Sequence, residues 1–337
     1  MRALRYALLV LPVAGGPSDV RNMANEKTTL VSRVTALIGK RQVARWKKWV
    51  GTVEWKRLDE EGRRIVISRM RAPKDAPTVL GEAEVVLRKK MWSAWHALLL
   101  CGADPTTCGP SWILTGGTAR RGPLMVGSVT PVDAITLPFY ATSQELLAIR
   151  ANEIGKEWAT HGRLGDTWFE PWIEIDRLLS AGSLSDILGY ALRSHSKAKC
   201  EPALDFSIPA FVRAAEGVIG LPRHMGNGPG FKDRALLLVP SLNTDPYVAG
   251  DAENLLLELY QLRNDCVHGK VPFLKLRSQG AAGEERAAKL QFVAETVARE
   301  ALLVALRFPD QSQFATRDAL EKAWSAGTFP ASTPRSS

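Results

Sequence analysis

The stretch LLLELYQLRNDCVHGK, residues 255–270, joins a helical pattern of apolar residues to side chains that can do chemistry. When it is wound as an α-helix of about 100° per residue, most of its apolar side chains fall on one arc. That arc carries Leu255, Leu256, Leu259, Tyr260, Leu262, Cys266 and Val267. Arg263 lies near the middle of the arc and is aimed at the core. Because a guanidinium cannot lose its charge by deprotonation, an anion must meet Arg263 there, either a protein carboxylate or a ligand such as phosphate.

The end of this stretch predicts where its helix stops. Gly269 is the residue type with which helices end in the left-handed conformation, so His268 is expected in the last turn. Asn264 lies four residues before His268, on the same face of the helix. Histidine is the side chain best suited to proton transfer near neutral pH. Arg263 and His268 are separated by about 140° on an ideal helix, so they share a site only if the chain bends at Gly269 or a second helix supplies the other half.

The pattern Arg263-Asn264, three further residues and then His268-Gly269 resembles the R-x4-H signature of HEPN domains. It is most similar to the Apea-like branch of that family, in which a leucine-rich helix carries the motif. The resemblance covers roughly residues 178–324, and the chain before it resembles no family that we can name.

Two flanking segments support this resemblance. Upstream, IPAFVRAAEGVIG, residues 208–220, is similar to the preceding helix of the family with its glutamate, here Glu216. Downstream, residues 284–308 resemble the long helix that follows the motif.

The resemblance implies a metal-independent endoribonuclease that needs no cofactor. His268 would take part in proton transfer at the ribose 2′-OH or at the leaving 5′-oxygen, and Arg263 would steady the scissile phosphate. Asn264 would orient His268 or the phosphate, with Glu216 and Gly269 in supporting positions. The resemblance also implies a homodimer formed through this domain, and a place in a bacterial anti-phage or toxin-like system.

A second interpretation belongs to a different class of function. On this interpretation the chain carries a non-catalytic HEPN module that binds RNA or a protein partner, or it is a pure assembly scaffold. In that case Glu216 neutralises Arg263 as a structural ion pair. The contact made by Arg263 separates the interpretations, because an arginine sealed against Glu216, with His268 pointing away, argues against an enzyme.

The chain from residue 143 onward predicts an all-α domain, assigned to residues 141–326 and followed by a disordered tail at 327–337. Gly and Pro divide the expected helices, which are residues 144–160, 172–194, 209–220, 232–239, 252–268, 284–308 and 316–324. Pro209 is expected in the first turn of its helix, where its missing N–H costs nothing. The helix at 284–308 is apolar on two faces, so either the rest of the bundle or a second protomer covers the second face.

Positive charge is concentrated in the first part of the chain. Residues 1–140 hold 22 Lys and Arg against 11 Asp and Glu, whereas residues 141–337 hold 22 against 24. Such an excess attracts polyanions, so nucleic acid is the expected partner, and the resemblance to HEPN domains implies that it is RNA. The densest run offers Lys40, Arg41, Arg45, Lys47 and Lys48 as nucleic-acid contacts. Trp46 and Trp49 within it either stack on bases or fill the core side of an amphipathic helix.

Residues 24–140 are interpreted as an α+β domain, in a protein that is predominantly α overall. Residues 50–57 and 64–71 predict a β-hairpin around a turn at 59–62. A helix is expected at residues 82–101, and further strands at 112–115 and 124–136. Residues 1–23 are expected to be a leader or a disordered N-terminus: a short apolar run follows two arginines, yet Met23 is an alternative start.

Several classes of site and location have no support in the sequence. No stretch approaches the roughly 20 apolar residues that span a bilayer, so no membrane partner is expected. The four cysteines lack CxxC spacing, which indicates neither a zinc site nor a disulfide framework and suits a reducing cytoplasm.

His96 is interpreted as a core residue, and His161 and His195 as solvated helix ends. His224 lies in the loop at 223–230, which either gates a site or is a surface connector.

Overall fold

The computed structural model of the chain describes residues 169–221 and 227–330 continuously and shorter pieces before them. These pieces are residues 3–11, 28–31, 44, 47–48, 64–72, 92–93, 95–97, 99–100, 112–115 and 124–125. The chain forms two compact units, Met1–Asp176 and Arg177–Ser337.

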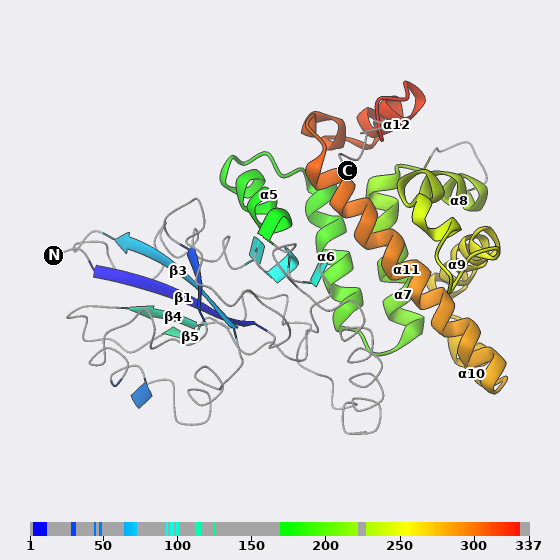
Figure 1. Cartoon of the computed structure of the whole chain (residues 1–337), viewed down its shortest axis with the longest axis horizontal. Helices are drawn as coiled ribbons and strands as arrows, with labels where there is room; N and C mark the ends of the chain where they lie inside the picture. The colour runs from blue at the N-terminus through cyan, green and yellow to red at the C-terminus, as the bar shows by residue number, and fades with distance from the viewer. Residues whose placement is uncertain are drawn as a thin grey trace. The chain divides into compact units, whose positions relative to one another are not determined.

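The first unit contains a five-stranded antiparallel sheet in the order β2-β3-β1-β4-β5 (Figure 1). Its strands are β1 (Ala3–Leu11), β2 (Thr28–Val31), β3 (Arg64–Ala72), β4 (Trp112–Thr115) and β5 (Leu124–Met125). β1 pairs with β3 over its whole length, from Ala3 opposite Ala72 to Leu11 opposite Arg64. Ala3–Leu11 therefore form the central strand of the sheet, within the segment predicted to be a leader or a disordered N-terminus.

The other elements predicted before residue 141 are described only in part. The segment predicted as the second strand of the hairpin is β3, which pairs with β1 and β2. Its predicted partner at 50–57 lies outside the described residues, as does the helix expected at 144–160. Within the helix expected at 82–101, Trp95, Leu99 and Leu100 are helical and fully buried. The α+β assignment of residues 24–140 stays a prediction.

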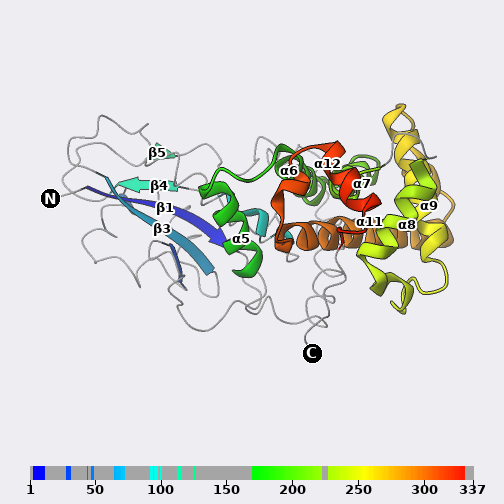
Figure 2. The same ribbon diagram turned by 90° about the horizontal axis from the view of Figure 1, so that it is seen from above.

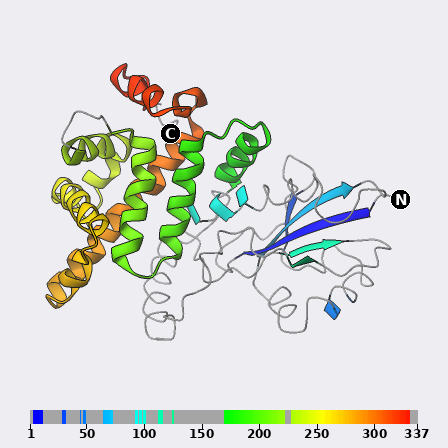
Figure 3. The ribbon, with the colours of Figure 1, turned by 180° about the vertical axis from the view of Figure 1, so that it is seen from behind.

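The second unit is helical, as expected. Its elements are α6 (Asp186–Cys200), α7 (Leu204–Ile219), α8 (Asn227–Leu238), η5 (Pro240–Asn243), α9 (Ala252–Val267), α10 (Pro272–Arg277), α11 (Ala281–Arg307), η6 (Gln311–Phe314) and α12 (Arg317–Ser325), and α5 (Phe169–Ser180) crosses the boundary into it. α6 and α7 lie side by side against α11 (Figure 1, Figure 3). α8, α9 and α10 gather around the N-terminal half of α11 (Figure 2). Among the described residues, no helix is long and apolar enough to cross a membrane.

The single helix predicted at residues 172–194 is wrong, because two helices occupy this region. α5 ends before Gly182, whose φ of +67° is the left-handed conformation that glycine adopts easily. α6 then starts at a new cap, where the Ser185 side chain accepts a hydrogen bond from the backbone N–H of Leu188 at 3.2 Å. The Gly and Ser between the helices are a stop signal and a start signal that the apolar period conceals.

The predicted position of Pro209 in a first turn is also wrong. α7 begins at Leu204, so Pro209 is an interior residue of the helix and cannot donate a hydrogen bond to the carbonyl of Asp205. Pro209 is nevertheless buried together with Ile208, Ala210 and Phe211. Packing of this apolar face therefore outweighs the lost backbone bond.

The loop predicted at residues 223–230 is partly helix. α8 begins at Asn227, and Pro229 lies in its first turn, where a missing backbone N–H is tolerated. His224 lies outside the described residues, so its suggested gating role stays a prediction.

Both apolar faces of α11 contribute buried residues to the helical unit. Leu290, Val293 and Val297 of the first face are fully buried, and so are Leu302 and Leu306 of the second. Phe292 and Leu303 of the second face are half-buried. The helical unit thus covers this face in part, and cover by a second protomer stays a prediction.

Candidate functional site

The C-terminal end of α9 has the geometry expected from its sequence. Gly269 has a φ of +77°, and its N–H donates to the carbonyl of Cys266 at 3.0 Å. The N–H of Lys270 donates to the carbonyl of Asp265, also at 3.0 Å. These two bonds form a Schellman motif, which satisfies carbonyls that the helix end would leave without donors. The predicted helix stop at Gly269 is confirmed.

Arg263 meets a protein carboxylate. Its Nη2 donates to Glu216 Oε2 at 2.7 Å, and its Nη1 donates to Asn264 Oδ1 at 2.8 Å. The guanidinium also lies over the Tyr260 ring, 5.6 Å from the centroid, which favours the cation. The pair is partly open to solvent, since 20% of the Arg263 side chain and 15% of the Glu216 side chain are exposed.

The fold of two packed helices creates this pair. Glu216 lies in the last turn of α7, and Arg263 lies in the second half of α9, which packs against α7. Leu255, Leu256 and Leu259 of α9 are fully buried and set the rotation of that helix. This rotation brings Arg263 to the border between the core and the surface rather than to the centre of the core.

His268 occupies a different environment from Arg263. It is the C-cap of α9, and its residue class is exposed. Its backbone N–H donates to the carbonyl of Asn264 at 3.1 Å, whereas the Asn264 side chain accepts from Arg263. Asn264 thus orients the arginine and holds the backbone of His268. In the described part of the chain, the imidazole itself makes no hydrogen bond.

The structure therefore brings three of the predicted residues together, namely Arg263, Asn264 and Glu216. His268 contacts that cluster through its backbone N–H, which donates to the carbonyl of Asn264. Arg263 is paired with Glu216, as the alternative interpretation expects, but the pair is partly exposed and so is not sealed in the core.

Asp205 is a structural determinant of this region that the sequence did not reveal. From the first turn of α7, its carboxylate accepts from the backbone N–H of Phe273 at 2.9 Å and of Leu274 at 3.2 Å. It also accepts from the Cys266 thiol at 3.8 Å. Burial, reinforced by the charge of Asp205, raises the pKa of the Cys266 thiol to about 12, so this cysteine is an inert thiol.

The remaining predicted residues belong to the first unit or lie outside the described residues. Lys47 and Lys48 are exposed, and Lys40, Arg41 and Arg45 lie outside the described residues. His96 is buried and contacts the Trp92 ring at 3.8 Å between centroids, as its interpretation as a core residue requires. His161 also lies outside the described residues.

His195 is not the solvated helix end that the sequence suggested. It lies inside α6, is 1% exposed, and packs edge-on against the Phe211 ring at 5.5 Å. Burial lowers the pKa of His195 to about 3, against the opposing effect of the Glu295 charge. The imidazole is therefore neutral at physiological pH. The predicted helix ended at residue 194, whereas α6 continues to Cys200, so the expected helix end at His195 does not exist.

Two further observations bear on function. Among the described residues, no group of three or more His, Cys, Asp or Glu side chains is arranged to hold a metal ion. No family model matches the chain, and neither the curated proteins nor the solved structures contain a match to it.

Proposed function

We propose that the protein is a metal-independent endoribonuclease of the HEPN type, with Arg263, Asn264 and His268 as its site residues. The observation that carries this proposal is the end of α9. There an arginine oriented by Asn264 lies within one and a half turns of an exposed histidine that is fixed as the helix cap.

These groups suit RNA cleavage by the ribose 2′-OH. The 2′-oxygen attacks the adjacent phosphorus and loses its proton, while the bond from phosphorus to the 5′-oxygen breaks and that oxygen gains a proton. The products are a 2′,3′-cyclic phosphate and a 5′-OH end. His268 transfers a proton at one of the two oxygens, and Arg263 stabilises the charge that builds up on the phosphate. Neither role requires a metal ion or a cofactor.

We further propose that the complete site combines two copies of the chain. On one ideal helix, side chains at positions 263 and 268 point about 140° apart. The Arg263 charge is already paired with the Glu216 carboxylate. A homodimer in which two α9 helices approach across a two-fold axis would set Arg263 of one chain near His268 of its partner. The basic segment before residue 141 would bind the RNA or a trigger, in the cytoplasm of a bacterium that uses the enzyme against phage or as a toxin.

A second candidate function is favoured by a specific contact. The ion pair between Arg263 and Glu216 spans α7 and α9, as a structural pair in a non-catalytic module would. Such a module would bind RNA or a protein partner without cutting it.

Incubation of the purified protein with a mixture of RNAs in EDTA tests the proposal. We expect cleavage that leaves 2′,3′-cyclic phosphate ends, and its loss in Arg263→Ala and in His268→Ala. RNA binding without cleavage by the unaltered protein would instead support the second candidate. Cleavage that survives both substitutions would place the active site elsewhere.

A further inference from the structure

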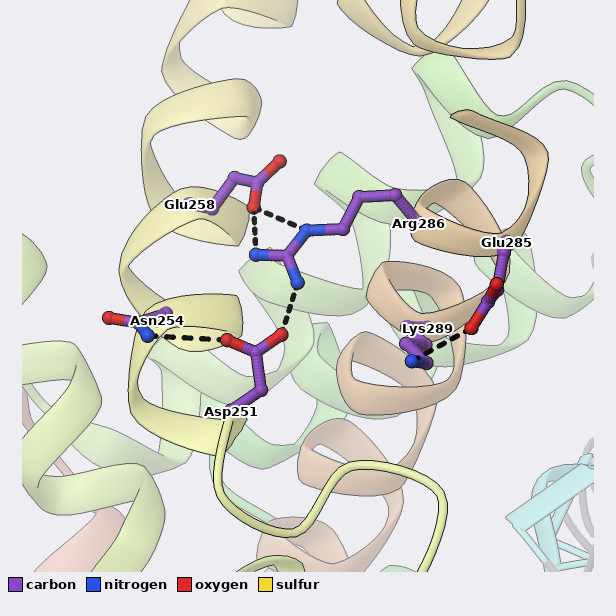
Figure 4. Close-up of polar contacts among 6 residues, drawn as sticks. All are labelled: Asp251, Asn254, Glu258, Glu285, Arg286 and Lys289. Carbon is purple, nitrogen blue, oxygen red and sulfur yellow. Dashed lines mark hydrogen bonds and ion pairs between the residues drawn. The ribbon is translucent and has the colours of Figure 1, made fainter. Parts of the chain in front are cut away.

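Arginines link helices at several places in the second unit, and Arg286, Arg234 and Arg263 differ in how fully their donors are used. Arg286 of α11 contacts two carboxylates, those of Glu258 and Asp251 (Figure 4). Arg234 of α8 forms two parallel bonds of 2.8 Å to Glu321 and also donates to backbone carbonyls. Both guanidinium groups are held as multidentate structural links.

Arg263 is less completely bound than these two. It contacts one carboxylate, through the single oxygen Oε2 of Glu216, and the amide oxygen of Asn264. Its Nε is buried and has no hydrogen-bond partner among the described residues. A buried donor without an acceptor is uncommon in folded proteins, and it indicates binding capacity that the structure does not use.

An anion with several oxygens fits this unused capacity better than Glu216 does. A phosphate group can accept from two N–H groups along one edge of a guanidinium at once, as the Glu321 carboxylate does at Arg234 and the Glu258 carboxylate does at Arg286. Because 20% of the Arg263 side chain remains exposed, a ligand from solvent can approach it. Glu216 and a phosphate would compete for the same cation.

We propose that Glu216 is a built-in competitor for the RNA phosphate, which holds Arg263 in an occupied state until RNA displaces it. This inference rests on the proposed function, because it concerns the same arginine. The strength of the pair between Glu216 and Arg263 then determines how tightly RNA must bind in order to displace Glu216. It also keeps the partly buried cation neutralised when no RNA is bound.

Binding of a fluorescent 2′-O-methyl RNA of mixed sequence tests this proposal, since the blocked 2′-oxygen prevents cleavage during the measurement. Glu216→Gln removes the competing charge and keeps the side-chain shape. We expect its Kd for the probe to fall about three- to tenfold relative to the unaltered protein. In the Arg263→Ala background, the same Glu216→Gln change should have no effect, because no cation remains to be released.

Glu258→Gln is the matched control, because it changes the net charge equally and removes one partner of Arg286. Its effect on the Kd should be small and should not depend on Arg263. A change of Kd in Glu216→Gln that equals the control, or that persists without Arg263, would overturn the competitor role. Weaker binding by Glu216→Gln would show that Glu216 positions the arginine for RNA, and would overturn it as well.

A second variant and a cleavage assay complete the design. Glu216→Asp keeps the charge but withdraws it by one methylene, so it should tighten binding less than Glu216→Gln. If neither variant folds, the pair is a structural necessity and the proposal fails. Tighter binding by Glu216→Gln with no cleavage of ordinary RNA by any form would retain the competitor and refute the enzyme. Cleavage of ordinary RNA without tighter binding by Glu216→Gln would retain the enzyme and refute the competitor.

Discussion

The side chain of Asp205 accepts a hydrogen bond from the backbone N–H of Phe273, 68 residues further along the chain, at 2.9 Å. Its second oxygen accepts from the N–H of Leu274. The N-cap of α10, Val271, provides no side-chain hydrogen bond of its own. A carboxylate from α7 therefore takes the place of the missing cap and fixes the start of α10, just after the candidate site residues.

Asp205→Ala should lower the free energy of unfolding by about 1–2 kcal/mol, the usual cost of losing a capping side chain. Urea unfolding followed by circular dichroism measures the change. Asp186→Ala is the control, because Asp186 is an exposed acidic residue in the first turn of α6. The control should change stability by no more than about 0.5 kcal/mol. Equal effects of the two substitutions would show that the bonds to α10 contribute nothing.

The same Gly→Ala substitution should have opposite effects at two glycines. Gly269→Ala forces a side chain into the left-handed region and should destabilise the protein by about 1 kcal/mol, although no atom lies within 4 Å of the added Cβ. Gly189→Ala, inside α6, places a Cβ in ordinary contact with Leu184 at 3.8 Å and should stabilise by about 0.5–1 kcal/mol. Thermal unfolding of both variants tests this. A neutral Gly269→Ala would contradict the cost assigned to the left-handed cap.

Stability should fall on acidification because of His195. Its pKa is about 3 in the folded protein and about 6.5 when unfolded, so between these values only the unfolded chain takes up the proton. The free energy of unfolding should therefore fall below pH 6.5, with a slope that approaches about 1.4 kcal/mol per pH unit. Above pH 6.5 the imidazole is neutral in both states and contributes no slope.

Replacing the histidine isolates this effect. His195→Leu should flatten the pH dependence between pH 6.5 and 5. The Glu295 carboxyl has a lowered pKa because the Lys199 charge outweighs the cost of burial. Its contribution to the free energy of unfolding is therefore lost only at a pH below this range. Chemical unfolding at several pH values provides the measurement. An unchanged slope in His195→Leu would assign the acid sensitivity to other groups.

The composite site predicts complementation between inactive variants. Arg263→Ala and His268→Ala should each abolish RNA cleavage and retain the fold. After mixing and subunit exchange, about half of the dimers are heterodimers with one intact site of two, so activity should return to about a quarter of that of the unaltered protein. No recovery despite demonstrated exchange would place both residues of each site in one chain. An active monomer would exclude the shared site.

The predictions that succeeded depend on signals that lie close together in the sequence. The leucine period and Gly269 are local, and together they give the course and the end of α9. The stop and start at Gly182 and Ser185 are equally local, but the continuous apolar period around them favoured one helix. Pro209 suggested a helix start, because a proline inside a helix costs a backbone hydrogen bond. The burial of its neighbours, which offsets that cost, becomes visible only from the packing of α7.

Contacts between distant helices could not be predicted in the same way. The need for an anion beside Arg263 follows from its place on the apolar arc, but the identity of that anion depends on how α7 packs against α9. Glu216 entered only through a family resemblance. Nothing near Phe273 in the sequence points to Asp205, since the two residues meet through the fold alone.

The position of α11 in the chain has a consequence for synthesis on the ribosome. α6, α7 and α9 all contact α11, yet residues 281–307 are translated after all three of them. α6 and α7 can pair as soon as both have emerged, whereas their apolar surfaces toward α11 stay bare until that helix leaves the exit tunnel. A nascent chain stalled before residue 281 should therefore bind chaperones. The ion pair of Arg263 and Glu216 would gain its final surroundings only after α11 has emerged.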